Sequence, residues 1–112
     1  MGVHRGQCEG LHPFRATQQD LALVRSAIPV LILTGEFDVQ THRSNGAIVK
    51  RALKHSQLVD IPGAMHHKGL NYECTRVMMR NFYNAPMQKV DESCLESIPR
   101  LRFVTDIAEL KK

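Results

Sequence analysis

The chain has 112 residues, of which 43% are apolar and 23% charged, and its formal net charge is +4. This length and composition predict one folded domain with one modest hydrophobic core. The longest apolar run, Ile28–Leu33, is too short to cross a bilayer, and the N-terminus lacks the apolar segment of a signal peptide. We therefore expect no membrane partner, and a cytoplasmic location if the chain is a complete protein.

The basic residues do not form a single patch. Lys50, Arg51 and Lys54 fall on one predicted helix, Arg76 and Arg80 fall on another, and no aromatic residues are interleaved with them for base stacking. Solvated helix faces explain this pattern better than a nucleic-acid surface. We therefore predict no nucleic-acid partner.

The first half of the chain predicts a connector followed by a buried strand. Residues 1–25 are polar and irregular, with a short helix expected near Thr17–Arg25. Pro29 suits the first position of a strand, and Val30–Leu33 is apolar without alternation, which is typical of a strand covered on both faces. Gly35 ends this strand.

A helix and a second strand come next. Between Thr41 and His55, apolar residues recur at helical spacing on one face, and Thr41 or Ser44 can cap the start. Gln57–Ile61 predicts a second strand, which Pro62-Gly63 closes. The apolar residues of the helix are Ala47, Ile48, Ala52 and Leu53.

A second helix is predicted from a longer pattern that stops before Pro86, formed by Leu70, Cys74, Val77, Met78 and Phe82. The order strand, helix, strand, helix implies a right-handed crossover and two parallel strands, hence an α/β fold. Two strands alone do not make such a sheet. Residues 87–112 are expected to form a surface loop and tail that packs back onto the body through Ile98, Leu101, Phe103 and Val104.

Cysteine and histidine spacing gives no metal site. Cys8, Cys74 and Cys94 form no close ligand pair, and adjacent His66 and His67 are the only histidine pair. We therefore expect no metal and no cofactor. The odd cysteine count allows at most one internal disulfide, and Cys74 and Cys94 could meet.

Two residues capable of proton chemistry come after the predicted strands. Asp38 lies three residues after Gly35, and His66 lies three residues after Gly63. A parallel crossover brings the carboxyl ends of both strands to one edge of the sheet, where α/β proteins place their functional groups. We therefore predict that Asp38 and His66 meet there, with the carboxylate orienting the imidazole.

The stretches Ile28–Asp38 and Leu58–His66 resemble the C-terminal portion of α/β-hydrolases, in the branch of tripeptidyl-aminopeptidase-like serine peptidases and esterases. That branch carries a Gly-Glu-x-Asp turn and a Pro-Gly-Ala-Gly-His turn, and the resemblance covers roughly residues 26–106. It implies a fragment of the doubly wound hydrolase sheet, comprising the last two parallel strands with their helices. Residues 107–112 are then a tail.

By this resemblance Asp38 is the acid of a catalytic triad and His66 the base, acting on a peptide or ester substrate in a full-length relative. The chain departs from the family at Val39–Arg43, which lacks the usual prolines after the acid, and at Met65, where the family has glycine. His67 leaves an ambiguity of one residue in the position of the base. Met65 could narrow the site or rotate the turn.

The family nucleophile is a serine in Gly-x-Ser-x-Gly, upstream of the acid. Ser44 has Gly46 after it but no glycine before it, and it lies after Asp38 in the chain, so a structural role at the helix start suits it better. Gly6-Gln7-Cys8-Glu9-Gly10 has the spacing, but nothing before Cys8 can form the buried strand that such a turn needs. A structural role therefore suits Cys8 better than that of a nucleophile.

The sequence thus predicts a C-terminal segment of a serine-type α/β-hydrolase that has the acid and base and is inactive alone. Its partner would then be an N-terminal hydrolase fragment. The alternative is a non-catalytic, hydrolase-derived interaction module, possibly a homodimer that covers its exposed strand edges with a second copy.

Overall fold

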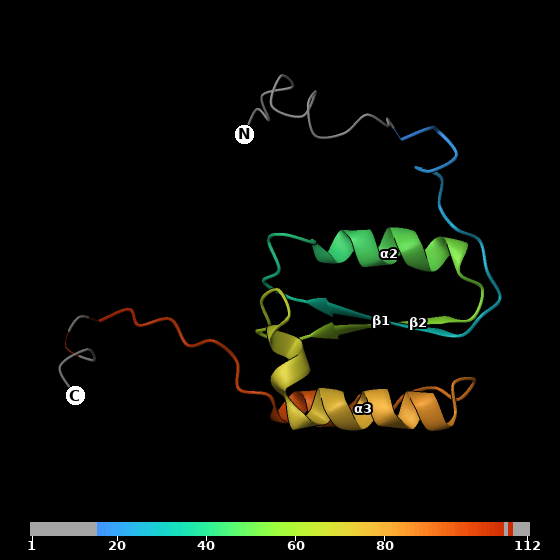
Figure 1. Ribbon diagram of the computed structural model, residues 1–112. Coiled ribbons are helices and arrows are strands. Elements are labelled where there is room, and N and C mark those ends of the chain that lie inside the picture. The colour runs from blue at the N-terminus through green and yellow to red at the C-terminus, as the bar shows by residue number, and fades with distance from the viewer. Residues whose placement is uncertain (1–15, 107, 109–112) are drawn as a thin grey trace, which may run out of the picture.

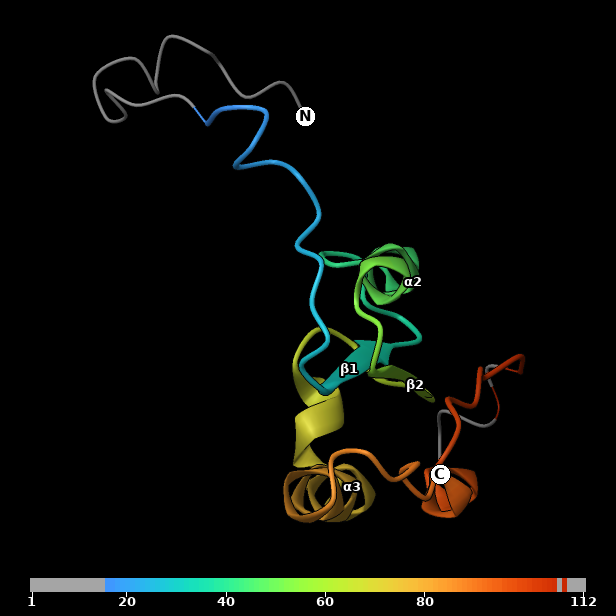
Figure 2. The same cartoon turned by 90° about the vertical axis from the view of Figure 1, so that its right-hand side faces the viewer.

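The computed structural model describes residues 16–106 and 108. Its elements are β1 (Val30–Gly35), α2 (Arg43–Ala52), β2 (Ser56–Ile61), the 3₁₀ helix η1 (Lys68–Asn71), α3 (Glu73–Asn84) and the 3₁₀ helix η2 (Ser93–Ser97). The strands pair in parallel, with Val30 opposite Ser56 and Gly35 opposite Ile61. Helices α2 and α3 lie on opposite faces of this two-stranded sheet (Figures 1 and 2). The predicted α/β order is confirmed.

The core lies between the sheet and α3. Successive residues of a strand point to opposite faces, and Leu31 and Leu33 of β1 pack with Val59 and Ile61 of β2 on the α3 side. Met78 of α3 is 1% exposed at the centre of this cluster. The remaining buried apolar residues are Ala64, Val90 and Ile98.

Helix α2 contacts the other face mainly through a glycine. Gly46 is the buried residue of this helix, and a Cβ there would lie 2.7 Å from Thr34 Cγ2 and 3.0 Å from Leu58 Cδ1. The absent side chain lets the helix approach the sheet closely. Ile48, expected on the apolar face, is instead 43% exposed because the contact runs through Gly46.

The start of α2 differs from the expectation that Thr41 or Ser44 caps it. His42 is the N-cap residue, and its Nδ1 accepts a hydrogen bond from the Ser44 backbone N–H at 3.3 Å. Thr41 does not cap the helix because its hydroxyl donates to Asp38 at 2.7 Å.

The prediction of a short helix near Thr17–Arg25 is wrong. The backbone N–H and hydroxyl of Thr17 both donate to Asp20 Oδ2 at 2.7 Å, which closes a turn. Such local bonds from side chain to backbone compete with helix formation. Ser26 then forms an isolated parallel bridge with Leu53, just before β1.

The segment after α3 returns to the sheet and is fastened at several points. The Gln57 side chain of β2 accepts from Val90 N at 2.8 Å and donates to Gln88 O at 2.7 Å. A disulfide joins Cys74 of α3 to Cys94 of η2, as the sequence allowed.

Beyond η2 the chain leaves the body. Ile98 is buried as expected, but Leu101, Phe103 and Val104 are 52%, 77% and 48% exposed, so the prediction that they pack back is wrong. Figure 1 shows this stretch running away from the sheet and helices. In the described residues the core cluster ends at Ile98, and these three side chains lie outside it because the chain turns away after that residue. No helix within residues 16–106 is long and apolar enough to span a membrane.

Candidate active site

The turns after β1 and β2 are bonded to each other. Glu36 N donates to Ile61 O at 3.1 Å, and Phe37 N donates to Ala64 O at 2.9 Å. Gly35 brings them together, because a Cβ at this position would lie 2.6 Å from the Ala64 carbonyl oxygen. The acid turn, which follows β1 and contains Asp38, and the histidine turn, which follows β2 and contains His66, therefore form one hydrogen-bonded unit at the carboxyl edge of the sheet.

Asp38 is 7% exposed and accepts several hydrogen bonds within its own turn. The backbone N–H groups of Gln40 and Thr41 each donate to its Oδ1 at 2.9 Å, and the Thr41 hydroxyl donates to its Oδ2 at 2.7 Å. The Thr41 N–H holds the pKa of Asp38 well below its ordinary value, with further lowering by His66, the Thr41 hydroxyl and the Gln40 N–H, against the opposing effect of burial. Asp38 is therefore a carboxylate at neutral pH.

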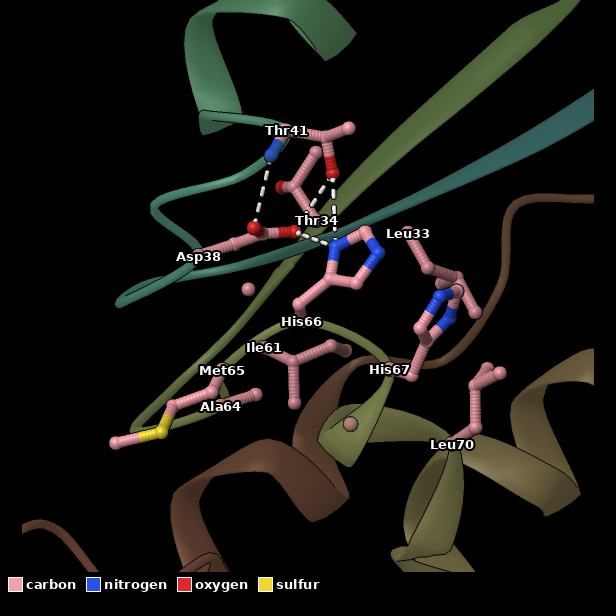
Figure 3. Close-up of a pocket in the computed structure, with 12 residues that line it drawn as sticks. Leu33, Thr34, Asp38, Thr41, Ile61, Ala64, Met65, His66, His67 and Leu70 are labelled. Atoms are coloured by element: carbon pink, nitrogen blue, oxygen red, sulfur yellow. Dashed lines mark hydrogen bonds and ion pairs between the residues drawn. The ribbon is translucent and has the colours of Figure 1, made fainter. Parts of the chain in front are cut away.

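The predicted meeting of Asp38 and His66 is confirmed as geometry. His66 Nδ1 lies 2.9 Å from Asp38 Oδ2 and 3.2 Å from the Thr41 hydroxyl (Figure 3). An ionised carboxylate only accepts hydrogen bonds, so Nδ1 must carry the proton. In the neutral ring Nε2 is then the unprotonated nitrogen, on the side turned away from the carboxylate.

His67 lies beside this pair but does not join it. Its backbone is left-handed, with φ of 61°, and its ring contacts His66 edge to face with centroids 3.9 Å apart. His67 is exposed, whereas the His66 side chain is 28% exposed. Of the two adjacent histidines, His66 is the one oriented by Asp38.

Asp38 and His66 are among the residues that line a pocket of about 180 Å³. Met65, which replaces the glycine of the family motif, lies on its wall and is 56% exposed. Among the described residues that line it there is no serine or cysteine. They are Leu33, Thr34, Gly35, Asp38, Thr41, Ile61, Ala64, Met65, His66, His67, Gly69 and Leu70.

Of the two nucleophile candidates, Ser44 lies within the described residues and is not among those that line the pocket. Ser44 lies in the first turn of α2, where its hydroxyl contacts His42 Nδ1 at 2.9 Å. Cys8 lies outside the described residues. Across residues 16–106, no group of three or more histidine, cysteine or acidic residues is placed to hold a metal ion.

Thr41 is the site residue that sequence reasoning missed. It contacts Asp38 through both its backbone N–H and its hydroxyl, and the hydroxyl also reaches His66. In the sequence its place three residues after the acid, just before a helix, suggests a cap. The same spacing is that of a turn closed by an aspartate side chain, which is the signal that could have identified it.

Parallel strands with helices on both faces, and a carboxylate paired with an imidazole at their carboxyl edge, are consistent with a portion of an α/β-hydrolase. The family model described as TAP-like protein matches residues 2–94, which is more than half of the chain. The chain belongs to this TAP-like family of α/β-hydrolases. No curated protein and no solved structure gives a significant match.

The family match begins at residue 2, within the stretch that the sequence predicts as a connector. Similarity to the family therefore starts before residue 26, where the resemblance carried by the two turns begins. The bounds of a connector at 1–25, a domain at 26–106 and a tail at 107–112 stay predictions.

Proposed function

We propose that this chain supplies the acid and base of a serine-type hydrolase, with Asp38 and His66 in those roles. The observation that supports this most directly is the 2.9 Å contact between His66 Nδ1 and the Asp38 carboxylate. It fixes the tautomer in which Nε2 can accept a proton, as the base of an acyl-transfer triad requires.

In the proposed reaction His66 Nε2 takes the proton of a serine hydroxyl as the oxygen attacks the carbonyl of a peptide or ester. The imidazolium then gives that proton to the leaving amine or alcohol, and the acyl group remains on the serine. Water attacks the acyl-enzyme with His66 again as base, and the released serine recovers its proton. Asp38 stabilises the imidazolium throughout, because the groups that lower its pKa keep it ionised. The reaction needs no cofactor.

The serine would come from another segment, and the chain alone would be inactive. No serine or cysteine is among the described residues that line the pocket, and no Gly-x-Ser-x-Gly occurs in the sequence. The proposed partner is an N-terminal hydrolase portion that carries the nucleophile and the oxyanion-hole donors.

The outer edge of β1 is where such a partner would pair. Within the described residues β1 pairs with β2 alone. Beside β1 lies an apolar groove whose lining includes Leu31, Leu33, Met79, Phe82 and Tyr83. A further strand pairing there would have its carboxyl end beside His66 if it ran parallel to β1.

The same open edge favours a second candidate function, a non-catalytic interaction module that self-associates. Unpaired strand edges with apolar neighbours promote pairing with another chain. In that case a second copy, rather than a hydrolase portion, would cover β1.

Complementation separates the two candidates. The purified chain is mixed with an N-terminal portion of a TAP-like hydrolase that contains Gly-x-Ser-x-Gly, and hydrolysis of a nitrophenyl ester is recorded. We expect activity from the mixture only, reduced on the order of 10⁴-fold by Asp38→Asn and abolished by His66→Ala.

His67→Ala is the matched control and should retain activity. Ester hydrolysis by the chain alone that depends on His66 would disprove inactivity in isolation. A mixture without activity, together with a stable dimer of the chain in analytical ultracentrifugation, would reject the catalytic proposal in favour of the interaction module.

A further inference from the structure

A second carboxylate, that of Glu36, lies between the acid turn and the histidine turn. Glu36 comes directly after β1 and is half-buried, and its Oε2 accepts a hydrogen bond from Gly63 N at 2.8 Å. Gly63 has φ of 65°, a left-handed conformation that glycine adopts without strain, and it lies three residues before His66. The side chain of the acid turn thus holds the backbone of the histidine turn.

Besides the contacts of the His66 ring with Asp38 and Thr41, three of the described hydrogen bonds join the two turns. Two are backbone bonds, to Ile61 O and Ala64 O, and no substitution other than by proline removes their donor or acceptor groups. The third is the bond from Gly63 N to the Glu36 carboxylate. A hydrogen bond to an ionised acceptor is roughly twice as strong as a bond between neutral groups. Of the three bonds, the one to Glu36 is therefore the strong bond that a side-chain substitution can remove.

The acid and the base depend on this link to different degrees. Asp38 is fixed within its own turn by Gln40 and Thr41. The His66 ring has no hydrogen bond within its own turn among the described bonds; its hydrogen-bond partners there are Asp38 and Thr41, both in the acid turn. The placement of its backbone therefore decides whether Nδ1 reaches the carboxylate.

We propose that Glu36 is a positioning residue for His66, acting through the Gly63 N–H rather than by contact with the imidazole. The effect of Glu36 on catalysis rests on the proposed function of the Asp38 and His66 pair. The Gly-Glu-x-Asp turn then carries two carboxylates with separate tasks, one that orients the ring and one that places the turn from which the ring projects.

The test uses NMR of the full chain labelled with ¹⁵N-histidine. Long-range proton–nitrogen spectra report which nitrogen of each imidazole carries the proton, and a His66→Gln variant assigns the His66 signals. Glu36→Met keeps the length of the side chain without an acceptor oxygen, and Glu36→Gln keeps an acceptor oxygen without the charge. Glu96→Met, at an exposed glutamate of η2, is the matched control.

We expect Glu36→Met to move the His66 nitrogen shifts toward those of a free imidazole. It should also speed hydrogen exchange of the Gly63 amide by about tenfold or more, which corresponds to the loss of one bond of about 1.4 kcal/mol. The pKa of Asp38 should stay below its ordinary value, and the signals of His55 should not move. Glu36→Gln should retain most of the native His66 shifts, and Glu96→Met should leave them unchanged.

Native His66 shifts in Glu36→Met would overturn the proposal, as would equal displacement by Glu36→Gln, since the acceptor oxygen that this variant retains would then not be what places His66. Loss of the fold in Glu36→Met would also count against it, because Glu36 would then serve the fold rather than the histidine turn. The measurement needs neither a nucleophile nor a partner, so its failure and that of the complementation assay are separate results.

Discussion

Substitution of Gly35 by alanine tests whether the two strand-end turns are as closely packed as the site requires. The added Cβ would lie 2.6 Å from the Ala64 carbonyl oxygen and 3.1 Å from the carbonyl oxygen of Met65. These are backbone atoms of the histidine turn, so no side-chain rotation relieves the clash. The turn would have to retreat by about 0.8 Å for an ordinary contact, a case of overpacking that typically costs about 1–3 kcal/mol.

Urea unfolding measures this cost. With an m value of about 1–2 kcal/mol/M for a chain of this size, a loss of about 2 kcal/mol lowers the midpoint by about 1–2 M. The retreat should also separate His66 from Asp38, and the His66 nitrogen shifts would report it. Gly69→Ala is the control, because its Cβ would meet only side-chain carbons of Ile61 and Ala64 at 3.3–3.4 Å.

An unchanged midpoint in Gly35→Ala would refute the close packing of the turns. So would a Gly69→Ala variant that loses as much stability, because the effect would then be general to added methyl groups near the site.

Three further outcomes are expected from contacts at and away from the site. Thr41→Val removes the hydroxyl bonded to the Asp38 carboxylate, so the pKa of Asp38 should rise toward its ordinary value in a carbon-detected NMR titration; an unchanged pKa would contradict the assigned bond. Because the folded pKa of Asp38 is lowered, its contribution to stability is present above about pH 4 and is lost as pH falls toward the folded pKa; Asp38→Asn should flatten this part of the acid-unfolding curve, and an equally steep curve would exclude Asp38 as its source. Cys94→Ser opens the disulfide to Cys74 across a separation of 20 residues and should cost about 3 kcal/mol in the free energy of unfolding relative to the oxidised wild-type chain; the reduced wild-type chain is the control and should be equally destabilised, and an unchanged free energy in Cys94→Ser would contradict the prediction.

The strands and the Asp38 and His66 pair could be predicted from the sequence because both depend on short-range signals. Each strand is a short apolar run ended by turn residues, and the parallel pairing then places the residues after both strands at one edge of the sheet. The prediction assumed only that a crossover connects Gly35 to Ser56, and α2 provides this crossover.

The features that the sequence did not predict correctly have a different physical origin. Thr41 resembles a cap in the sequence because helix starts and aspartate-closed turns use the same residue types, and only the fold shows that its hydroxyl faces Asp38. Leu101, Phe103 and Val104 are expected on the body because they are apolar. Whether a segment reaches the body depends on the path of the whole chain, and in the described residues the chain leaves the core after Ile98 (Figure 1).

Asp38 and His66 are 28 residues apart, and the described hydrogen bonds that fix their mutual distance all lie between Glu36 and His66. Their alignment therefore depends on one short stretch of the chain and on no contact with a partner. A nucleophile that docks beside β1 would meet a pair that is already aligned. Binding would then cost only the translational and rotational entropy of bringing the two partners together. No further entropy would be lost in ordering Asp38 and His66.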